Sequence, residues 1–547
     1  MFRLVCAWVL VNGLLMTPGW VSAAVTDGPA AGWIALEGAL LVGLLALLPR
    51  RSWTRALAWV AAAGTVLVTL VGFFDLVFRV SLARSLNLFL DLYLSTVIWN
   101  LSVGNMGLPR TLVALAGLTL VLTLATWGLA RLLSPVDFAR IAPGRGAGRL
   151  ATRLAGVALV AFSALGLTRE APPALQSRLA TPVAGLVRAQ ATLFRETRAE
   201  KAAFAAELAQ PGSYADVPGL LARLRGRDVL LTFIESYGMA ALNDPEFAAV
   251  IQPRLDTLAA RMAAAGVHLA TGELVSSTKG GQSWYAHGTT ISGLWISNQM
   301  RYDLLMADDR ETLVDDFERA GHRSVGIMPA ITMTWPDGVR LGFDELFTGE
   351  NIPYAGPPLF WVTMPDQFTW SYLAKVRAEA AGTPLFVETA MVSSHAPWTP
   401  VLSMIPWDSI GDGSGFEPFR QEGHPPEELW VDIDTLRHGY ARSLDYALAA
   451  MTGFAEREMD ERTLLIVLGD HQAAPWVIGD TIDAGVPVHV FAKDPALLEP
   501  FLAWGFAPGA VPDSTRTPPR MNEFRDWFVR AFSDAGPAVA PLPSRTR

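Results

Sequence analysis

Two apolar segments of the sequence end in residues that can bind metal ions. The run VLLTFI is followed by ESYG, which begins at Glu235, and the run LLIVLG is followed by Asp470 and His471. Carboxylate oxygens and an imidazole nitrogen together suit Zn²⁺, Mn²⁺ or Mg²⁺. Each group alone is more often a cap or a chance dipeptide. Because both follow very apolar runs, where an unpaired charge is expensive, the three residues together are candidate metal ligands.

A stretch rich in hydroxyl groups, SSTKGGQSWYAHGTTISGL, occupies residues 276–294 between these two runs. A hydroxyl nucleophile needs activation, and a bound divalent cation can lower its pKa. If Ser283 begins a helix, the free amide groups there also favour an anionic phosphate. The alternative is an ordinary serine or threonine helix cap, which the stretch taken alone favours.

A further candidate follows the apolar run LFVETAMV. The element SSHAPW places His395 directly after this run. A histidine at a strand end can donate a hydrogen bond to a phosphate oxygen or protonate a leaving group. A lone histidine in this position is more often structural.

Short β-rich runs that alternate with helical stretches must position these side chains. The expected strands are Asp228–Ile234, Ser324–Ile327, Pro384–Val392, Thr463–Leu468 and Pro487–Ala492. The expected helices are Pro253–Ala265, Arg310–Ala320 and Thr435–Ala455. Such alternation predicts an α/β domain with a mostly parallel sheet covered by helices on both faces. Ligands of such sheets bind beyond the carboxyl ends of the strands, where the candidate residues fall.

The composition indicates a membrane protein. The 547 residues are 51% hydrophobic and 17% charged, with a mean hydropathy of +0.30, whereas soluble domains average about 25% charged residues. The net charge of −9 argues against nucleic acid as a partner. The single cysteine, Cys6, excludes a disulfide framework. Five apolar runs are long enough to span a bilayer: Leu4–Val25, Trp33–Leu48, Ala56–Phe78, Leu112–Leu133 and Leu150–Leu167.

Arginine placement predicts the orientation of these spans, because cytoplasmic loops collect basic residues. Basic residues cluster between spans two and three and between spans four and five, which places the N-terminus inside and everything after Leu167 outside. The first run also has the features of a cleaved signal peptide, although we favour an uncleaved anchor. The segment Ser81–Trp99 contains Asn87 and Asp91, so we expect an interfacial or re-entrant helix, or a partly buried connector.

The predicted domain layout follows. Residues 1–170 form the transmembrane domain, and 171–226 form a juxtamembrane segment with an amphipathic helix over Gln176–Leu208. Residues 227–535 form the extracytoplasmic catalytic domain, and 536–547 form a C-terminal tail.

In this order, the motifs resemble those of the lipoteichoic acid synthase, phosphoglycerol transferase and phosphoethanolamine transferase group of the sulfatase (alkaline phosphatase) superfamily. The resemblance covers roughly Asp228 to Ala492. It implies an alkaline-phosphatase-like domain with Glu235, Asp470 and His471 as metal ligands. The nucleophile position falls on Ser283, which would also touch the metal.

The resemblance leaves several roles open. Threonine is the usual nucleophile of the group, so Thr278 is the second choice, with Thr289 and Thr290 more distant. His395 would bind substrate or serve the leaving group, and His287 and Trp335 would line the substrate site.

Three departures limit the substrate assignment. Lipoteichoic acid synthases carry an arginine shortly after an aromatic residue, whereas no basic residue follows Trp335 until Arg340. Many phosphoethanolamine transferases have disulfides in the outer domain, which this chain cannot form. The formylglycine signature of sulfatases is absent around Ser283.

The expected function is transfer of a phospho-head-group, phosphoglycerol or phosphoethanolamine, from a membrane phospholipid to an envelope glycan or lipid acceptor. Localisation in a bacterial inner membrane with the catalytic domain in the periplasm follows from the resemblance and the predicted orientation. Two alternatives are a membrane-anchored phosphodiesterase or sulfatase-like hydrolase, and an inactive sensor or scaffold that keeps the fold.

Overall fold

The structure is a computed structural model, which describes residues 2–25, 32–49, 51–134, 146–168, 172–359, 362–421, 432–479 and 483–534. It divides into two compact units. We call Met1–Val80 with Arg84–Glu200 the helical unit, and Ser81–Ala83 with Lys201–Arg547 the sheet unit. The predicted C-terminal tail, 536–547, lies outside the described residues.

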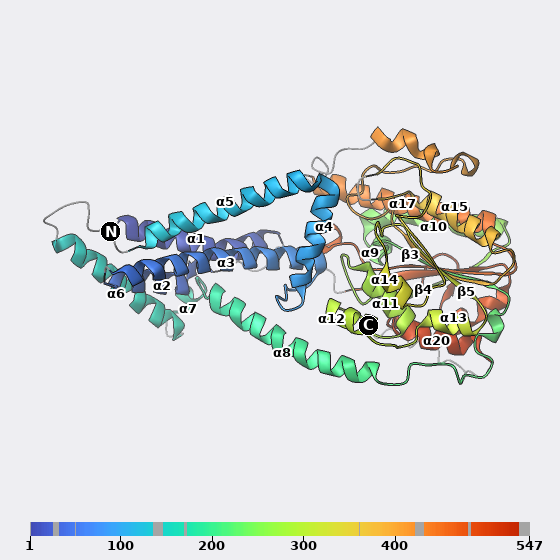
Figure 1. The fold of residues 1–547 in the computed structure, drawn as a ribbon, viewed down its shortest axis with the longest axis horizontal. Helices are drawn as coiled ribbons and strands as arrows, with labels where there is room; N and C mark the ends of the chain where they lie inside the picture. Colours follow the sequence, from blue (N-terminus) through green and yellow to red (C-terminus); the bar gives the residue numbers. More distant parts are fainter. Residues whose placement is uncertain are drawn as a thin grey trace. The chain divides into compact units, whose positions relative to one another are not determined.

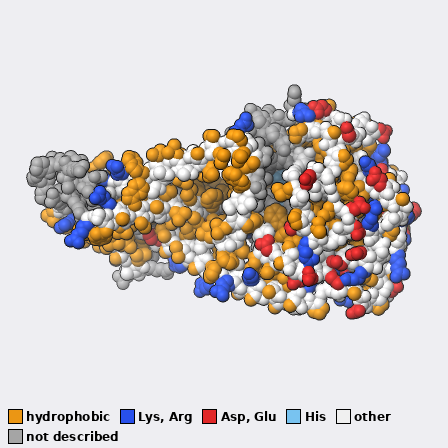
Figure 2. Space-filling view, in the orientation of Figure 1, with side chains coloured by type: hydrophobic (Ala, Val, Ile, Leu, Met, Phe, Trp, Pro, Cys, Tyr) orange, Lys and Arg blue, Asp and Glu red, His pale blue; other side chains and the backbone are white. Residues whose placement is uncertain are grey.

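The helical unit consists mainly of apolar helices (Figure 1). In chain order these are α1 (Phe2–Val25), α2 (Leu36–Leu47), α3 (Ser52–Leu82), α4 (Leu94–Met106), α5 (Leu108–Leu133), α6 (Gly146–Leu167), α7 (Pro173–Gln176) and the first part of α8 (Pro182–Leu208), with the parallel pair β1 (Ile34–Ala35) and β2 (Leu179–Ala180). Hydrophobic side chains dominate the surface of this unit, whereas the sheet unit displays charges of both signs (Figure 2).

Four of the five predicted spans correspond to long helices. Among the described residues, α1, α3, α5 and the part of α6 from Leu150 to Leu167 are long and apolar enough to cross a membrane. The second predicted span corresponds to α2, which has only 12 residues, about 18 Å of helix. This is shorter than the roughly 30 Å hydrocarbon core.

The segment Ser81–Trp99 is not one continuous helix. α3 runs on to Leu82, a 3₁₀ turn covers Asp91–Tyr93, and α4 begins at Leu94. Asp91 is buried and makes a two-pronged ion pair with Arg84, at 2.7 and 2.9 Å. Asn87 donates to Thr197. Between the end of α3 and Tyr93 the chain therefore forms the partly buried connector that was one of the two alternatives.

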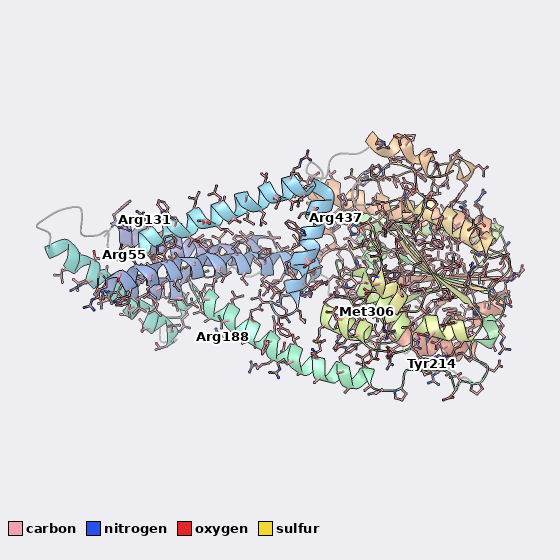
Figure 3. The ribbon with its side chains drawn as sticks, in the orientation of Figure 1. Arg55, Arg131, Arg188, Tyr214, Met306 and Arg437 are labelled. Carbon is pink, nitrogen blue, oxygen red and sulfur yellow. The ribbon has the colours of Figure 1, made fainter. Side chains whose placement is uncertain are left out.

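Two labelled arginines lie at the same end of the helical unit (Figure 3). Arg55 is in the first turn of α3, and Arg131 is in the last turn of α5. This is the arrangement on which the predicted orientation of the spans depends.

The sheet unit contains an eight-stranded sheet with the order β10-β4-β9-β8-β3-β7-β5-β6. Its strands are β3 (Asp228–Ile234), β4 (His268–Val275), β5 (Arg323–Met328), β6 (Glu345–Thr348), β7 (Leu385–Met391), β8 (Thr463–Gly469), β9 (Gly485–Ala492) and β10 (Ala507–Pro508). The block from β8 to β6 is parallel, whereas β9 pairs antiparallel with β8 and β4. The mostly parallel sheet is thus confirmed. β4, β6 and β10 were not predicted.

Helices cover both faces of this sheet (Figure 1). One face carries α10 (Pro245–Ala264), α15 (Asp366–Glu379) and α17 (Ile433–Glu458); the other carries α11 (Ser283–Ser292), α13 (Leu313–Arg319), α19 (Glu499–Trp504) and α20 (Glu523–Phe532). The remaining helices are α9 (Ala240–Asn243), α12 (Gln299–Ala307), α14 (Pro336–Arg340) and α18 (Pro475–Ile478).

Strand β3 shows why both faces need a cover. Leu230 and Ile234 enter the core under α10, whereas Val229, Leu231 and Phe233 enter the core under α11 and α13. Successive side chains of a strand point to opposite faces, so an unbroken apolar run is buried on both sides.

Candidate functional site

The two predicted metal-binding strand ends lie side by side. β3 and β8 are neighbours in parallel register, with Ile234 opposite Gly469. The segments that follow approach so closely that a Cβ atom on Gly238 would overlap the side chain of Gln472, and one on Gly469 would overlap the Tyr237 carbonyl group. Glycine at both positions is therefore required to bring the two carboxyl ends together.

Glu235, Asp470 and His471 form one buried cluster. Nε2 of His471 lies 3.4 Å from Oε1 of Glu235 and 3.6 Å from Oδ2 of Asp470. One potential ligand atom from each residue lies within 4.8 Å of the others. The other oxygen of Asp470 accepts from the backbone amides of Ser236, at 2.8 Å, and His471, at 2.6 Å. These bonds orient Asp470, as the outer partners of metal-binding carboxylates commonly do.

The histidine tautomer fits a cation at this cluster. Nδ1 of His471 lies 2.8 Å from the carbonyl oxygen of Gln472, which can only accept, so Nδ1 carries the hydrogen. In the neutral ring Nε2 then presents its lone pair toward the two carboxylates. Two carboxylate oxygens and one imidazole nitrogen form a donor set suited to Zn²⁺ or Mn²⁺. Glu235, Asp470 and His471 would therefore hold a divalent cation.

The electrostatics of the cluster reflect an excess of negative charge. Burial disfavours ionisation of both carboxyl groups, and the negative charge of Glu235 further raises the pKa of Asp470. For Glu235, the positive charges of His471 and His395 outweigh burial and lower its pKa. Burial opposes the charged form of His471, but Asp470 and Glu235 raise its pKa. A divalent cation would offset this negative charge.

Ser283 lies at the cluster. It is the first residue of α11, after Gln282 in the left-handed region with a φ of 64°. Its Oγ donates to Oε2 of Glu235 at 3.0 Å and lies 3.2 Å from Nε2 of His471. The structure thus brings together the predicted nucleophile and the three predicted metal ligands. The amide groups of Ser283 and Trp284, in the first turn of α11, favour an anionic group at the same point.

The other candidate hydroxyls are engaged elsewhere. Thr278 donates to the carbonyl oxygen of Gly281 at 2.8 Å. Thr289 is buried and donates to Ser277, and Thr290 is buried and donates to the carbonyl oxygen of Ala286. None of these threonines hydrogen-bonds Glu235 or His471 in the described part of the chain.

The SSHAPW element is fastened to the same strand ends. The Ser394 hydroxyl donates to the carbonyl oxygen of Glu235 at 2.6 Å. Asp366, a residue missed in the sequence, is buried at the start of α15 and accepts from the amides of Val392, at 2.7 Å, and Ser393, at 2.8 Å. His395 is thereby positioned close enough for its charge to lower the pKa of Glu235.

His287 and Trp335 have different surroundings. Nδ1 of His287 lies 2.7 Å from Oε1 of Glu388, a fully buried residue of β7, and its ring stacks on Phe233. Sequence reasoning missed Glu388 because it lies inside an apolar strand, not at a strand end. Trp335 packs against Phe343 and the backbone of Gly338. In the described residues, neither side chain hydrogen-bonds Ser283 or the three predicted metal ligands.

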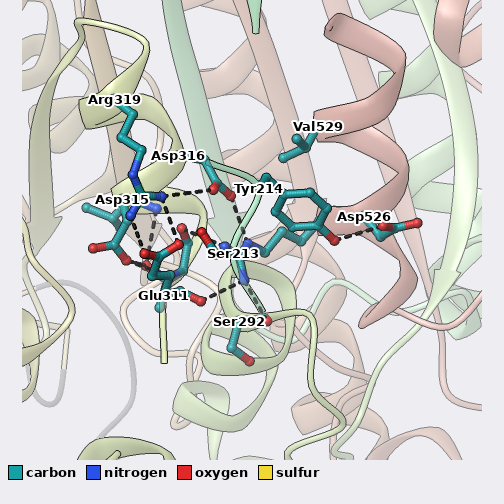
Figure 4. Close-up of polar contacts among 12 residues, drawn as sticks. Ser213, Tyr214, Ser292, Glu311, Asp315, Asp316, Arg319, Asp526 and Val529 are labelled. Carbon is teal, nitrogen blue, oxygen red and sulfur yellow. Dashed lines mark hydrogen bonds and ion pairs between the residues drawn. The ribbon is translucent and has the colours of Figure 1, made fainter. Parts of the chain in front are cut away.

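A second buried cluster holds the other end of α11 (Figure 4). Arg525 of α20 donates through Nε to Asp316 of α13 at 2.9 Å and through Nη1 to the carbonyl oxygen of Ser292, the last residue of α11, at 3.3 Å. Its remaining bonds reach the carbonyl oxygens of Glu311 and Thr312. Both charged residues are at most 1% exposed. α11 is therefore fixed at both ends.

Fold and site together define a class of protein. The chain has long apolar helices near its N-terminus, followed by an α/β domain with a candidate divalent-metal site beside a serine hydroxyl. No protein-family model matches the sequence, and no curated protein is similar to it.

Solved structures similar to this chain include a phosphoethanolamine transferase, a lipoteichoic acid synthase and a phosphoglycerol transferase. Lipooligosaccharide phosphoethanolamine transferase A from Neisseria meningitidis has 11% identity and a TM-score of 0.45, with 91% of this chain and 87% of that chain covered. The lipoteichoic acid synthase LtaP from Listeria monocytogenes has 13% identity and a TM-score of 0.40, with 60% and 77% covered. The phosphoglycerol transferase GacH from Streptococcus pyogenes has 13% identity and a TM-score of 0.34, with 54% and 73% covered.

Proposed function

We propose that this chain is a membrane-anchored, metal-dependent transferase that moves phosphoglycerol or phosphoethanolamine from a phospholipid to an envelope glycan or lipid acceptor. The observation that carries the proposal is the position of Ser283 Oγ, 3.0 Å from Glu235 and 3.2 Å from His471, at the start of a helix. The predicted orientation of the helices places this site in the periplasm of a bacterium, anchored in the inner membrane.

The reaction would proceed in two displacements at phosphorus. Ser283 Oγ gives its proton to solvent water and forms a bond to the phosphorus of the lipid phosphodiester, while the bond from phosphorus to the glycerol oxygen of diacylglycerol breaks. His395 donates the proton that this oxygen needs to leave as an alcohol. In the second displacement His395, now deprotonated, takes the proton of an acceptor hydroxyl. The acceptor oxygen bonds to the same phosphorus, the bond from phosphorus to Ser283 Oγ breaks, and Ser283 takes back a proton from solvent water.

The residues of the chain have separate tasks in this scheme. A divalent cation such as Mn²⁺, Zn²⁺ or Mg²⁺, held by Glu235, Asp470 and His471, would lower the pKa of the hydroxyl and offset charge on the phosphate oxygens. The amide groups of the first turn of α11 would orient the phosphate. His287 would contact the substrate through Nε2, because Glu388 holds Nδ1 of the ring.

Mass analysis of the full-length protein after incubation with phosphatidylglycerol or phosphatidylethanolamine tests the proposal. We expect the mass of a phospho-head-group on the peptide that contains Ser283, lost in Ser283→Ala and retained in the matched variant Thr278→Ala. Modification of Thr278 instead would overturn the nucleophile assignment. An added acceptor separates transfer from hydrolysis: release of the head group only to water would favour the phosphodiesterase alternative.

A further inference from the structure

The helical unit contains a cavity of about 580 Å³. Its walls come from the C-terminal halves of α1 and α3 and from the first turns of α8, all within the helical unit. α1 and α3 are two of the helices that are long and apolar enough to cross a membrane. The volume is within the range of roughly 300–1,000 Å³ that is typical of small-molecule sites.

A proline and a glycine shape the contact of α1 with α3 beside the cavity. Pro18 of α1 cannot donate to the carbonyl group of Leu14, four residues earlier. The Thr69 hydroxyl of α3 lies 3.0 Å from that oxygen and 2.9 Å from the carbonyl oxygen of Thr65, so its one hydrogen is shared between the two acceptors. The freed backbone acceptor therefore has a polar contact in an apolar environment. A Cβ atom on Gly72 would lie only 3.0 Å from the ring of Pro18, so the two helices touch here.

The lining is apolar in one part and polar in the other. Leu15, Val68, Leu76 and Leu186 contribute apolar walls, and Asp75, Arg79 and Gln190 contribute the polar rim. Both carboxylate oxygens of Asp75 are engaged, one with Nε of Arg79 at 2.7 Å and one with the amide of Leu86 at 2.9 Å. Gln190 bonds the backbone of Leu86 and Leu88.

Arg79 is the rim residue whose terminal guanidinium nitrogens can still donate hydrogen bonds. Among the described residues, its terminal nitrogens hydrogen-bond no other group, and 55% of its side chain is exposed. Asp75 holds the guanidinium in place through Nε, which leaves both terminal nitrogens for an external anion. A guanidinium binds phosphate through two parallel hydrogen bonds.

We propose that this cavity binds a membrane glycerophospholipid, with one acyl chain between α1, α3 and α8 and the phosphate group at Arg79. An amphiphile matches both parts of the lining, and the helices that form two of the walls are themselves suited to the bilayer. The binding claim is independent of the reaction at Ser283. It adds a lipid site in the helical unit to the catalytic site in the sheet unit.

Two glycines provide a matched pair of variants. A Cβ atom on Gly185 of α8, which lines the cavity, meets nothing within 4 Å, so Gly185→Leu introduces a side chain into open space. Gly117 of α5 also meets nothing within 4 Å and does not line the cavity. Both changes replace glycine within a helix, which favours helix formation by roughly 1 kcal/mol. Gly117→Leu is therefore the control.

Photolabelling tests the site directly. The full-length protein is placed in nanodiscs of phosphatidylethanolamine and phosphatidylglycerol that contain a phosphatidylethanolamine with a diazirine in one acyl chain. We expect label in peptides of α1, α3 and α8 that line the cavity. Gly185→Leu should lower it roughly tenfold and Gly117→Leu should leave it unchanged. Arg79→Gln should also lower it roughly tenfold, through loss of a charge-assisted hydrogen bond.

Two outcomes would overturn the proposal. One is cavity labelling in Gly185→Leu and Arg79→Gln equal to that of the unchanged protein. The other is native mass spectrometry in which the protein retains a fatty acid or detergent in place of a phospholipid. Ser283→Ala is carried in parallel, and its labelling should be unaffected, so failure of the lipid site and failure of the proposed reaction give different results.

Discussion

The two buried charge clusters of the sheet unit hold opposite ends of one helix but differ in their charge balance. At the C-terminal end of α11, Arg525 and Asp316 cancel each other, and backbone carbonyl groups accept three more of the guanidinium hydrogens. At the N-terminal end, Glu235 and Asp470 share one histidine. A buried cluster that is balanced needs nothing further, whereas one with surplus negative charge is suited to a cation.

Replacement of one carboxylate by its amide should have the most different effects at the two clusters. We expect Asp470→Asn to lower kcat by at least about ten-thousandfold, roughly 5.5 kcal/mol of barrier, because the cation loses a ligand. The thermal midpoint of the metal-free protein should stay the same or rise, because a like charge beside Glu235 is removed. Asp316→Asn is the matched control, and it should lower the midpoint. A lower midpoint in metal-free Asp470→Asn would contradict the surplus-charge interpretation.

Loss of Arg525, the positive charge of the balanced cluster, should destabilise the folded protein. Arg525→Met leaves Asp316 buried with only Arg319, 4.0 Å away, as a counter-charge, and loss of one partner of a buried ion pair costs about 3–5 kcal/mol. Thermal unfolding in detergent measures the loss. The double variant Arg525→Met with Asp316→Leu should recover most of it, since apolar pairs of similar volume often replace buried ion pairs without loss. Equal stability of Arg525→Met and the unchanged protein would refute a structural role for the pair.

Removal of the metal should affect only the surplus-charge cluster. A cation at about one hundred times its Kd stabilises the folded protein by roughly 2.7 kcal/mol, so a chelator should lower the thermal midpoint and added Mn²⁺ or Zn²⁺ should restore it. This response should disappear in Asp470→Asn and persist in Arg525→Lys. A chelator effect of the same size in Asp470→Asn would place the cation elsewhere.

The smallest expected effect is a pH dependence of metal affinity. In the metal-free site, burial and Glu235 raise the pKa of Asp470, so Asp470 takes up a proton as the pH falls through that raised value. A proton there competes with the cation, and affinity should fall with falling pH, by up to about tenfold per pH unit. Metal titrations from neutral into acidic buffer measure this. Unchanged affinity would mean that Asp470 is not a ligand.

The predictable part of the site consisted of residues at strand ends. Glu235 and Asp470 follow apolar runs, and Ser283 comes shortly after two glycines. Because neighbouring parallel strands bring their carboxyl ends together, such positions can be identified without knowing which residues they contact. Glu388 and Arg525 could not be found in this way. Glu388 lies within a strand, 101 residues from its partner His287, and Arg525 lies within a helix, 209 residues from its partner Asp316. Nothing in the local sequence pattern records such pairings.

The fold shows the same limit. The strands with mostly apolar runs were placed within two residues of their true ends, because burial on both faces leaves a clear signal. β4 was missed because Thr271, Gly272 and Glu273 are consecutive and leave at most two apolar residues in a row within it. α10 was predicted to begin at Pro253, since proline favours the first turn, whereas it begins at Pro245, and Pro253 lies inside it.

The attachment of α11 at both ends makes it a short lever. Its ten residues span about 15 Å, so a tilt of about 4° about the end held by Arg525 displaces Ser283 by about 1 Å. Such a displacement costs a reacting group on the order of a hundredfold in rate. We therefore expect Arg525→Lys to lower kcat clearly while the thermal midpoint changes little. Reactivity at Ser283 would then depend on a helix that lies more than two hundred residues further along the chain.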